Sequence, residues 1–239
     1  MTTLVLLPGL GCDARIWDAQ LPVFVGHSVW MSDLHTRHDS VPEMAQALLD
    51  DQSGDLILCG ASLGGMLALE LYAQAPQRVR GLALLGTSAR PDTPERTAMR
   101  VEGMRLMQQA LEGKPAGFAA LLQANLPFSM HGDALDDKPL VARFMAMLRE
   151  TGPAGLIRQN RMSMTRRDHR ATLANVRCPT LVLCGEDDQV TPPEHGQELA
   201  ANIAGAALEL IPRCGHMLTM ERPAAVNTAL RAWLGRLSS

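Results

Sequence analysis

The chain has 239 residues, a net charge of −3 at pH 7 and only 3% aromatic residues. This length suits one large α/β domain, or such a domain with an insertion, and it is enough to bury a substantial core. The charge balance, the lack of a basic run and the few aromatics argue against binding to nucleic acid or to an anionic membrane. No apolar stretch reaches the roughly 20 residues that a membrane-spanning helix needs.

The N-terminal segment predicts a buried strand. Residues Leu4 to Leu7 are continuously apolar, and Pro8-Gly9 then ends the run. The segment has no charged start and no small-residue cleavage site, so it does not resemble a secretion signal. We therefore expect a cytoplasmic protein.

Cysteine usage is consistent with reduced thiols. The five cysteines form no Cys-x-x-Cys pair, and their number is odd. Cys59 and Cys184 lie in strand patterns, where we expect them to pack in the core. Cys12 and Cys214 lie in predicted loops close to the expected site, but we assign them no catalytic or metal-binding role. We expect neither a metal nor a cofactor.

Strands and helices alternate in the first 90 residues, as in a parallel sheet with helical crossovers. Ser40 predicts the N-cap of a helix over residues 41–49, with Glu43 in the position of a capping box. The strands predicted in this part of the chain, in order, are Leu4–Leu7, Ser28–Met31, Asp55–Cys59 and Gly81–Gly86.

The third of these strands ends in a Gly-x-Ser-x-Gly pattern. Gly60 and Gly64 flank Ser62, and an unbroken helical pattern follows to about Gln74. Glycines on both sides permit the close backbone approach that a strained strand-to-helix turn requires. The alternative for the pattern alone is a turn whose serine caps the helix.

Residues 91–170 predict a helical insertion. No convincing strand occurs there, and eight of the fourteen methionines fall in it. We interpret it as a lid whose methionines, such as Met130 and Met145, line an adaptable apolar substrate site; core packing is the alternative for any single methionine. Four helices are predicted in the insertion: Pro94–Leu111, Pro115–Gln123, Leu140–Glu150 and Pro153–Met162.

The sheet resumes after the insertion. Thr180–Cys184 and Ala207–Ile211 predict two more strands, with a helix from Pro192-Pro193 between them and a final helix from about Pro223. The predicted fold is a doubly wound, mostly parallel sheet of about six strands. Residues 1–90 and 171–239 form its core, and residues 91–170 form the inserted lid.

Polar side chains with complementary chemistry follow separate strands of this sheet. Ser62, Asp188 and His216 come in that order along the chain. Since the carboxyl ends of parallel strands share one edge, we expect these side chains to meet there. Serine becomes a nucleophile when a neutral imidazole accepts its proton, and a carboxylate orients that imidazole. The backbone N–H groups of Leu10 and Leu63 are the expected oxyanion-hole donors.

These motifs resemble the α/β-hydrolase superfamily over essentially the whole chain. The similarity rests on Leu7-Pro8-Gly9 with Trp17, on Gly60-Ala61-Ser62-Leu63-Gly64-Gly65, on the strand ending in Gly185-Glu186-Asp187-Asp188, and on Gly215-His216. In that family pattern the acid stands three residues after the glycine, which selects Asp188 over Asp187. Small bacterial carboxylesterases and enol-lactone hydrolases have the most similar motifs.

The remaining histidines are interpreted without a catalytic role. His35 and His38 have a His-x-x-His spacing, but no third metal ligand is evident, so we expect a solvated loop. His131, His169 and His195 are expected to be surface or lid residues. His169 follows no strand and is therefore the weaker alternative to His216 as a base.

The function predicted from these observations is hydrolysis of a carboxylic ester with a small, largely apolar acyl group. A serine at the turn argues against chemistry at saturated carbon, which uses a carboxylate nucleophile. Lactone or thioester hydrolysis, carbon–carbon bond hydrolysis and acyl transfer stay open, because the same three residues serve them. A hydrolase-fold protein that binds a ligand without turnover is the alternative from another class.

Overall fold

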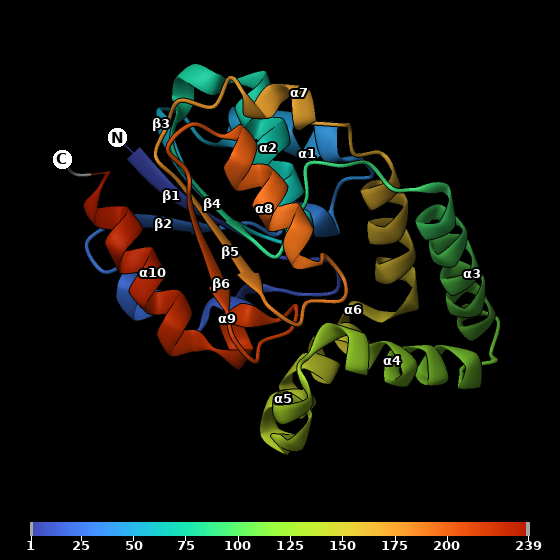
Figure 1. Ribbon diagram of the computed structural model, residues 1–239. Helices are drawn as coiled ribbons and strands as arrows, with labels where there is room; N and C mark the ends of the chain where they lie inside the picture. The colour runs from blue at the N-terminus through green and yellow to red at the C-terminus, as the bar shows by residue number, and fades with distance from the viewer. Residues whose placement is uncertain (1, 238–239) are drawn as a thin grey trace.

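A six-stranded, fully parallel sheet forms the centre of the molecule in the computed structural model, which describes residues 2–237 (Figure 1). The strand order is β2-β1-β3-β4-β5-β6. This confirms the predicted doubly wound sheet. The strands are β1 (Thr2–Leu7), β2 (Ser28–Met31), β3 (Asp55–Ala61), β4 (Val79–Leu85), β5 (Thr180–Gly185) and β6 (Ala207–Ile211).

The central strands are apolar on both faces because helices cover both sides of the sheet. In β1, Leu4 and Leu6 pack into one core layer, and Val5 and Leu7 pack into the other. All four side chains are almost completely buried. This double burial explains why the strand is a continuous apolar run with no alternation of polar residues.

Helices from distant parts of the chain form the two outer layers (Figure 1). On one face lie α1 (Val41–Asp51), α2 (Leu63–Gln74) and α8 (Pro193–Asn202). The other face is covered by α10 (Pro223–Gly235) together with the 3₁₀ turn η1 (Ala14–Trp17). The Ser40 hydroxyl accepts the Glu43 N–H at 3.3 Å, so the predicted cap of α1 is confirmed.

The insertion between β4 and β5 is entirely helical, as predicted, and lies beside the carboxyl edge of the sheet (Figure 1). The two helices expected on either side of Gly152 meet there in a kink and are labelled together as α6; Gly152 has the non-helical φ of +65° and ψ of 172°, and Pro153 follows it. The inserted helices are α3 (Pro94–Leu111), α4 (Ala116–Ser129), α5 (Gly132–Asp136) and α6 (Lys138–Met164).

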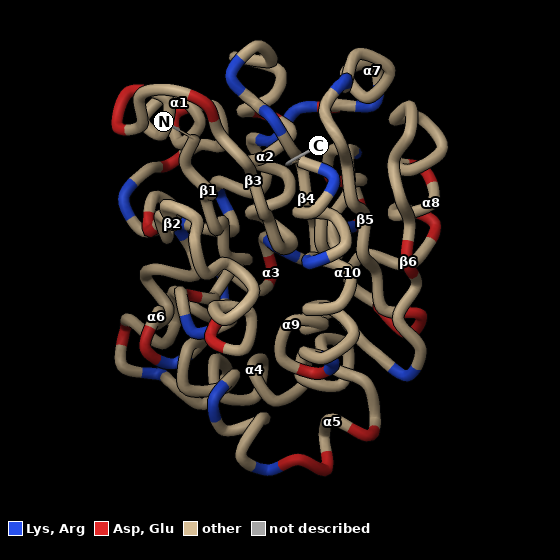
Figure 2. The backbone as a smooth tube through the Cα atoms, turned by 90° about the vertical axis from the view of Figure 1, so that its left-hand side faces the viewer, with Lys and Arg blue, Asp and Glu red and all other residues tan. Residues whose placement is uncertain are grey.

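The remaining elements are single turns at the surface or beside the site. Acidic and basic residues are interspersed over the backbone (Figure 2). Within residues 2–237, no helix is both long and apolar enough to cross a membrane. The short elements are η2 (Leu21–Val23), η3 (Leu34–Thr36), η4 (Pro76–Arg78), α7 (Arg170–Leu173) and α9 (Leu218–Glu221).

Candidate active site

Ser62 lies at the apex of the turn between β3 and α2, in a strained backbone conformation. Its φ is +52° and its ψ is −113°, a region that non-glycine residues rarely adopt. The Ser62 N–H donates to the Leu85 carbonyl at 2.9 Å, and the Thr87 hydroxyl donates to the Ser62 carbonyl at 2.7 Å. These bonds to the end of the neighbouring strand β4 and to the loop after it hold the serine above the sheet edge.

The two glycines that flank Ser62 are required because neighbouring backbone atoms leave no space for a Cβ atom at either position. A Cβ on Gly60 would lie 2.4 Å from the Gly64 carbonyl oxygen, and one on Gly64 would lie 2.0 Å from the Leu7 carbonyl oxygen. Either methyl group would overlap backbone atoms that have no room to move. The Gly-x-Ser-x-Gly pattern therefore reflects the tight packing of α2 against β1 and β3, as the sequence predicts.

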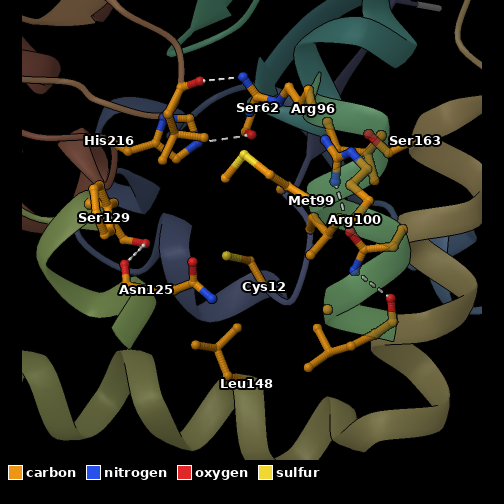
Figure 3. A pocket seen from close by; sticks show the side chains of 18 of the residues that line it. Cys12, Ser62, Arg96, Met99, Arg100, Asn125, Ser129, Leu148, Ser163 and His216 are labelled. Atoms are coloured by element: carbon orange, nitrogen blue, oxygen red, sulfur yellow. Dashed lines mark hydrogen bonds between the residues drawn. The ribbon is translucent and has the colours of Figure 1, made fainter. Parts of the chain in front are cut away.

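Ser62, His216 and Asp188 form a continuous chain of polar contacts; Figure 3 shows Ser62 and His216 side by side at the cavity. Ser62 Oγ lies 2.9 Å from His216 Nε2, and His216 Nδ1 lies 2.8 Å from Asp188 Oδ2. The three residues are far apart in the sequence, and the loops after β3, β5 and β6 bring them together. In an arrangement of this kind an imidazole can accept the proton of the serine hydroxyl, and a carboxylate can orient the imidazole.

The Asp188 carboxylate is fixed by its own loop. Its Oδ1 accepts the N–H groups of Val190 and Thr191, both at 2.8 Å, and its Oδ2 accepts the Thr191 hydroxyl at 2.9 Å. Burial raises the pKa of Asp188, but the charge and hydrogen bond of His216 and the bonds from Thr191 outweigh it. The net pKa lies below the ordinary value, so the acid is an anion at neutral pH.

A buried glutamate holds the loop that carries His216. Glu221 accepts the N–H of Gly215 at 3.0 Å and the N–H of Met217 at 2.9 Å, the residues on either side of His216. It also accepts the His131 N–H at 2.9 Å, which ties the insertion to this loop. Three backbone donors around one carboxylate make the imidazole position depend on Glu221.

The residues of the two expected oxyanion donors, Leu63 and Leu10, both line the cavity that opens at Ser62. Leu63 is the first residue of α2, so its N–H has no partner within the helix. Gly9, in the loop after β1, approaches so closely that a Cβ there would lie 3.3 Å from Ser62 Cβ. Leu10 follows in this loop. Because β1 lies where the strand order reverses, the site occupies the usual ligand crevice of such sheets.

A cavity of about 980 Å³ opens at Ser62, between the sheet edge and the inserted helices. It is large enough for a substrate of drug-like size. Ser62 and His216 are among its lining residues. Apolar side chains make up most of its wall and include Leu10, Ile16, Met107, Leu121, Phe144 and Leu148.

The predicted role of two methionines is wrong. Met130 and Met145 are 2% and 3% exposed, pack in the core clusters, and are not among the residues that line the cavity. Met145 lies on the inner face of α6, and Met130 directly follows α4 in an extended conformation, with its side chain packed in the core. The methionines that do line the cavity are Met66, Met99, Met107 and Met217.

The cysteines behave largely as expected. Cys59 and Cys184 are buried in the sheet. Cys12 lines the cavity, and Cys214 is fully buried beside the His216 loop. Burial raises the pKa of the Cys12 thiol to about 12, which leaves it protonated and unreactive at neutral pH.

The interpretation of His35 is also wrong. His35 is 5% exposed rather than solvated, because η3 folds under the Cys12 loop and His35 Nε2 lies 2.8 Å from the Cys12 carbonyl. His169, expected at the surface or in the lid, lies at the end of the segment 91–170 and is buried: its Nε2 lies 3.0 Å from Oε2 of the fully buried Glu70. Both short segments contain polar residues, which obscured their burial in the sequence.

Three residues of the site were not predicted from the sequence. Thr191, Glu221 and Gln159 act through hydrogen bonds to Asp188, to the His216 loop and to the Gly11 N–H. Gln159 and Gly11 lie 148 positions apart. Only Thr191, three residues after Asp188, is near enough in the sequence to have been found by local turn chemistry.

Comparison with known proteins gives one family. Residues 4–229 match the model of the Alpha/beta hydrolase family. The chain is 28% identical to a pimeloyl-[acyl-carrier protein] methyl ester esterase of Aromatoleum aromaticum, over 92% of this chain and 93% of that protein.

Two further similar proteins are named for substrates of other kinds. The chain is 29% identical to a 2-hydroxy-6-oxononadienedioate/2-hydroxy-6-oxononatrienedioate hydrolase of Comamonas testosteroni, over 71% of this chain and 59% of that protein. The enol-lactonase of Burkholderia xenovorans LB400 superposes with a TM-score of 0.84 and 25% identity, over 98% of this chain and 91% of that one.

Proposed function

The chain belongs to the alpha/beta hydrolase family, and we propose that it is a serine hydrolase that cleaves a carboxylic ester with a small, largely apolar acyl group. The observation that carries this proposal is the Ser62–His216–Asp188 chain at a strained turn that opens into a mainly apolar cavity. The relative named as a methyl ester esterase supports the ester as substrate.

In the first half of the reaction, Ser62 Oγ attacks the ester carbonyl carbon while His216 Nε2 takes the hydroxyl proton. The negative charge that forms on the carbonyl oxygen is stabilised by the N–H groups of Leu63 and Leu10. Asp188 holds the imidazole in the correct tautomer and stabilises its charged form. His216 then gives the proton to the leaving alcohol, and the acyl group stays on Ser62.

In the second half, water attacks the acyl-enzyme, with His216 as base, and releases the carboxylic acid. Helices α3 to α6 act as a lid in this proposal, because they cover the cavity and keep other water away from the acyl group. A cytoplasmic location is part of the proposal and is supported by the five cysteines, all of which are free thiols.

Carbon–carbon bond hydrolysis is the second candidate. One relative is named as a hydrolase of 2-hydroxy-6-oxononadienedioate and 2-hydroxy-6-oxononatrienedioate. These compounds contain a ketone and no ester. Lactone hydrolysis is supported in the same way by the enol-lactonase. Both reactions, like thioester hydrolysis and acyl transfer, need a serine nucleophile, a base and an oxyanion hole, so the same residues serve them.

The test is turnover of p-nitrophenyl esters of increasing acyl length by the native chain and by Ser62→Ala. We expect turnover by the native chain and a loss of at least 10³-fold in kcat for the variant. Equal rates would refute a serine mechanism. A fluorophosphonate probe should add one adduct on Ser62, located by peptide mass spectrometry; ligand binding without turnover or labelling would instead support a binding protein.

A further inference from the structure

Three arginines surround one buried carboxylate at the α3 wall of the cavity. The Asp92 side chain is 4% exposed; Arg100 Nε lies 2.8 Å from its Oδ2, and Arg166 Nη2 lies 2.6 Å from its Oδ1. Arg96 Nε lies 3.6 Å from Oδ1, beyond hydrogen-bond distance. The side chains of Arg96, Arg100 and Arg166 are 33%, 14% and 5% exposed. Three positive charges thus share one negative charge.

The three guanidinium groups differ in how far their donors are satisfied. Arg166 also donates to the Arg90 carbonyl and to Ser163, so its role is structural. Arg100 donates to Asn160 Oδ1 at 2.8 Å in addition to Asp92. Arg96 donates to the Val190 carbonyl at 2.7 Å, and no carboxylate within residues 2–237 lies within hydrogen-bond distance of it.

Arg96 and Arg100 both line the main cavity, where Figure 3 shows them along the α3 wall. Two acidic residues line it as well. Glu102 is paired with Arg105 at 2.6 Å, and Glu95 is exposed to solvent, which screens its charge. Neither provides a buried counter-ion for the two arginines.

The pKa of Arg96 reflects its burial and this excess of positive over negative charge. Burial lowers the pKa of its guanidinium below the ordinary value, and the charges of Arg100 and Arg166 lower it further, against the opposing charges of Asp92 and Asp188. A partly buried cation that shares its nearest carboxylate with two other arginines carries a desolvation cost that an incoming anion offsets. The planar edge of a guanidinium matches the two oxygens of one carboxylate.

We propose that the substrate carries a carboxylate as well as the scissile bond, and that Arg96, supported by Arg100, binds this carboxylate in the cavity next to Ser62. This inference rests on the proposed hydrolase function and narrows it to acidic esters with an otherwise apolar body. The apolar wall of the cavity binds the part of the substrate between its carboxylate and its scissile bond, and the arginines determine which end of the substrate points away from Ser62.

The test compares substrates that differ only in charge. On the acyl side the pair is p-nitrophenyl hydrogen adipate and methyl p-nitrophenyl adipate; on the alcohol side it is 4-carboxyphenyl hexanoate and its methyl ester. We expect the native chain to prefer the acid in one pair by at least tenfold in kcat/KM. Arg96→Gln should reduce that preference below threefold, while Arg96→Lys should keep part of it.

Arg149→Gln is the matched control, because it removes one exposed arginine from α6 and should leave the preference unchanged. The inference is overturned if the native chain prefers neither acid, or if Arg96→Gln keeps the full preference. Circular dichroism and melting temperature of Arg96→Gln establish that the variant is folded.

Binding to Ser62→Ala separates this inference from the proposed function. By calorimetry we expect monomethyl adipate to bind at least tenfold more tightly than dimethyl adipate, with the difference lost when Arg96→Gln is added. Equal affinities in the adipate pair and also in the pair of 4-carboxyphenyl hexanoate and its methyl ester would refute the carboxylate site even if ester turnover is found. If the native chain turns over none of the four esters, the hydrolase proposal fails, and the binding difference still decides whether the carboxylate site exists.

Discussion

Gln159 on the inserted helix α6 accepts the backbone N–H of Gly11 through its Oε1 at 2.6 Å. Gly11 has φ +70° and directly follows Leu10, whose N–H is a proposed oxyanion donor. A Cβ on Gly11 would lie 2.4 Å from Leu148 of the same helix. The insertion therefore fixes the conformation of the loop after β1 through one buried polar contact.

Replacing Gln159 should weaken catalysis more than substrate binding. In Gln159→Leu the buried Gly11 N–H loses its acceptor, which costs about 1–3 kcal/mol and lets the Leu10 amide move. We expect kcat to fall about tenfold with KM changed less than twofold. Gln159→Glu keeps an acceptor and is the control. A rise in KM with kcat unchanged would show that Gln159 shapes the cavity instead of the oxyanion site.

Glu221 should be essential for the position of His216. Glu221→Gln places an NH₂ group against backbone donors at one of the two carboxylate oxygens, so at least one charge-assisted hydrogen bond is lost. We expect kcat to fall at least tenfold and Tm to fall by about 4–10 °C. Fluorophosphonate labelling of Ser62 should slow in parallel.

Glu209→Gln is the matched control for this prediction, because Glu209 is an exposed glutamate on β6. It should change neither Tm nor labelling. A Glu221→Gln variant that loses stability but labels at the native rate would show that Glu221 supports the fold and does not position the imidazole.

Much of this architecture follows from local patterns. Double burial makes residues 4–7 of β1 and residues 56–59 of β3 apolar, and steric contact requires Gly60 and Gly64, so strands and turn are visible in the sequence. The order of Ser62, Asp188 and His216 follows from strand order. Each strand and the turn are marked by residues that are close together in the chain.

The features that were missed depend on contacts between distant segments. The burial of His35 requires η3 to fold beneath the Cys12 loop. The importance of Glu221 becomes apparent only in the folded chain, where three backbone N–H groups donate to its carboxylate. Likewise, whether Met130 faces the cavity or the core depends on how α4 packs against the sheet domain. A methionine is equally hydrophobic at either place, so the sequence does not distinguish a cavity-lining methionine from a core methionine.

Buried neutral histidines should make the fold sensitive to acid. Burial lowers the pKa of His35 and of His169 below the ordinary value of 6.5. The unfolded chain then binds more protons than the folded chain at a pH between the folded pKa and 6.5. The free energy of unfolding therefore rises with pH in this window and falls as the pH drops below about 6.5.

His35→Gln tests this linkage. The glutamine amide can still donate to the Cys12 carbonyl but does not titrate, so the loss of stability between pH 7 and pH 5 should be smaller than in the native chain. Denaturant unfolding at several pH values measures it. The exposed His27, changed to glutamine, is the control. An unchanged pH dependence in His35→Gln would contradict the prediction.

The turn at Ser62 should tolerate no side chain at Gly64. In Gly64→Ala the new Cβ would lie 2.0 Å from the Leu7 carbonyl oxygen and 2.8 Å from Leu7 Cβ, so α2 must shift away from β1. A shift of this kind moves Ser62 relative to His216, and displacements of about 1 Å can cost 10²-fold in rate. We expect kcat to fall at least 10²-fold and Tm to fall by several degrees. Gly235→Ala, at the end of α10 with no atom within 4 Å of its new Cβ, is the matched control and should leave both unchanged. Native activity in Gly64→Ala would mean that the turn relaxes without moving the serine, and would contradict the steric argument.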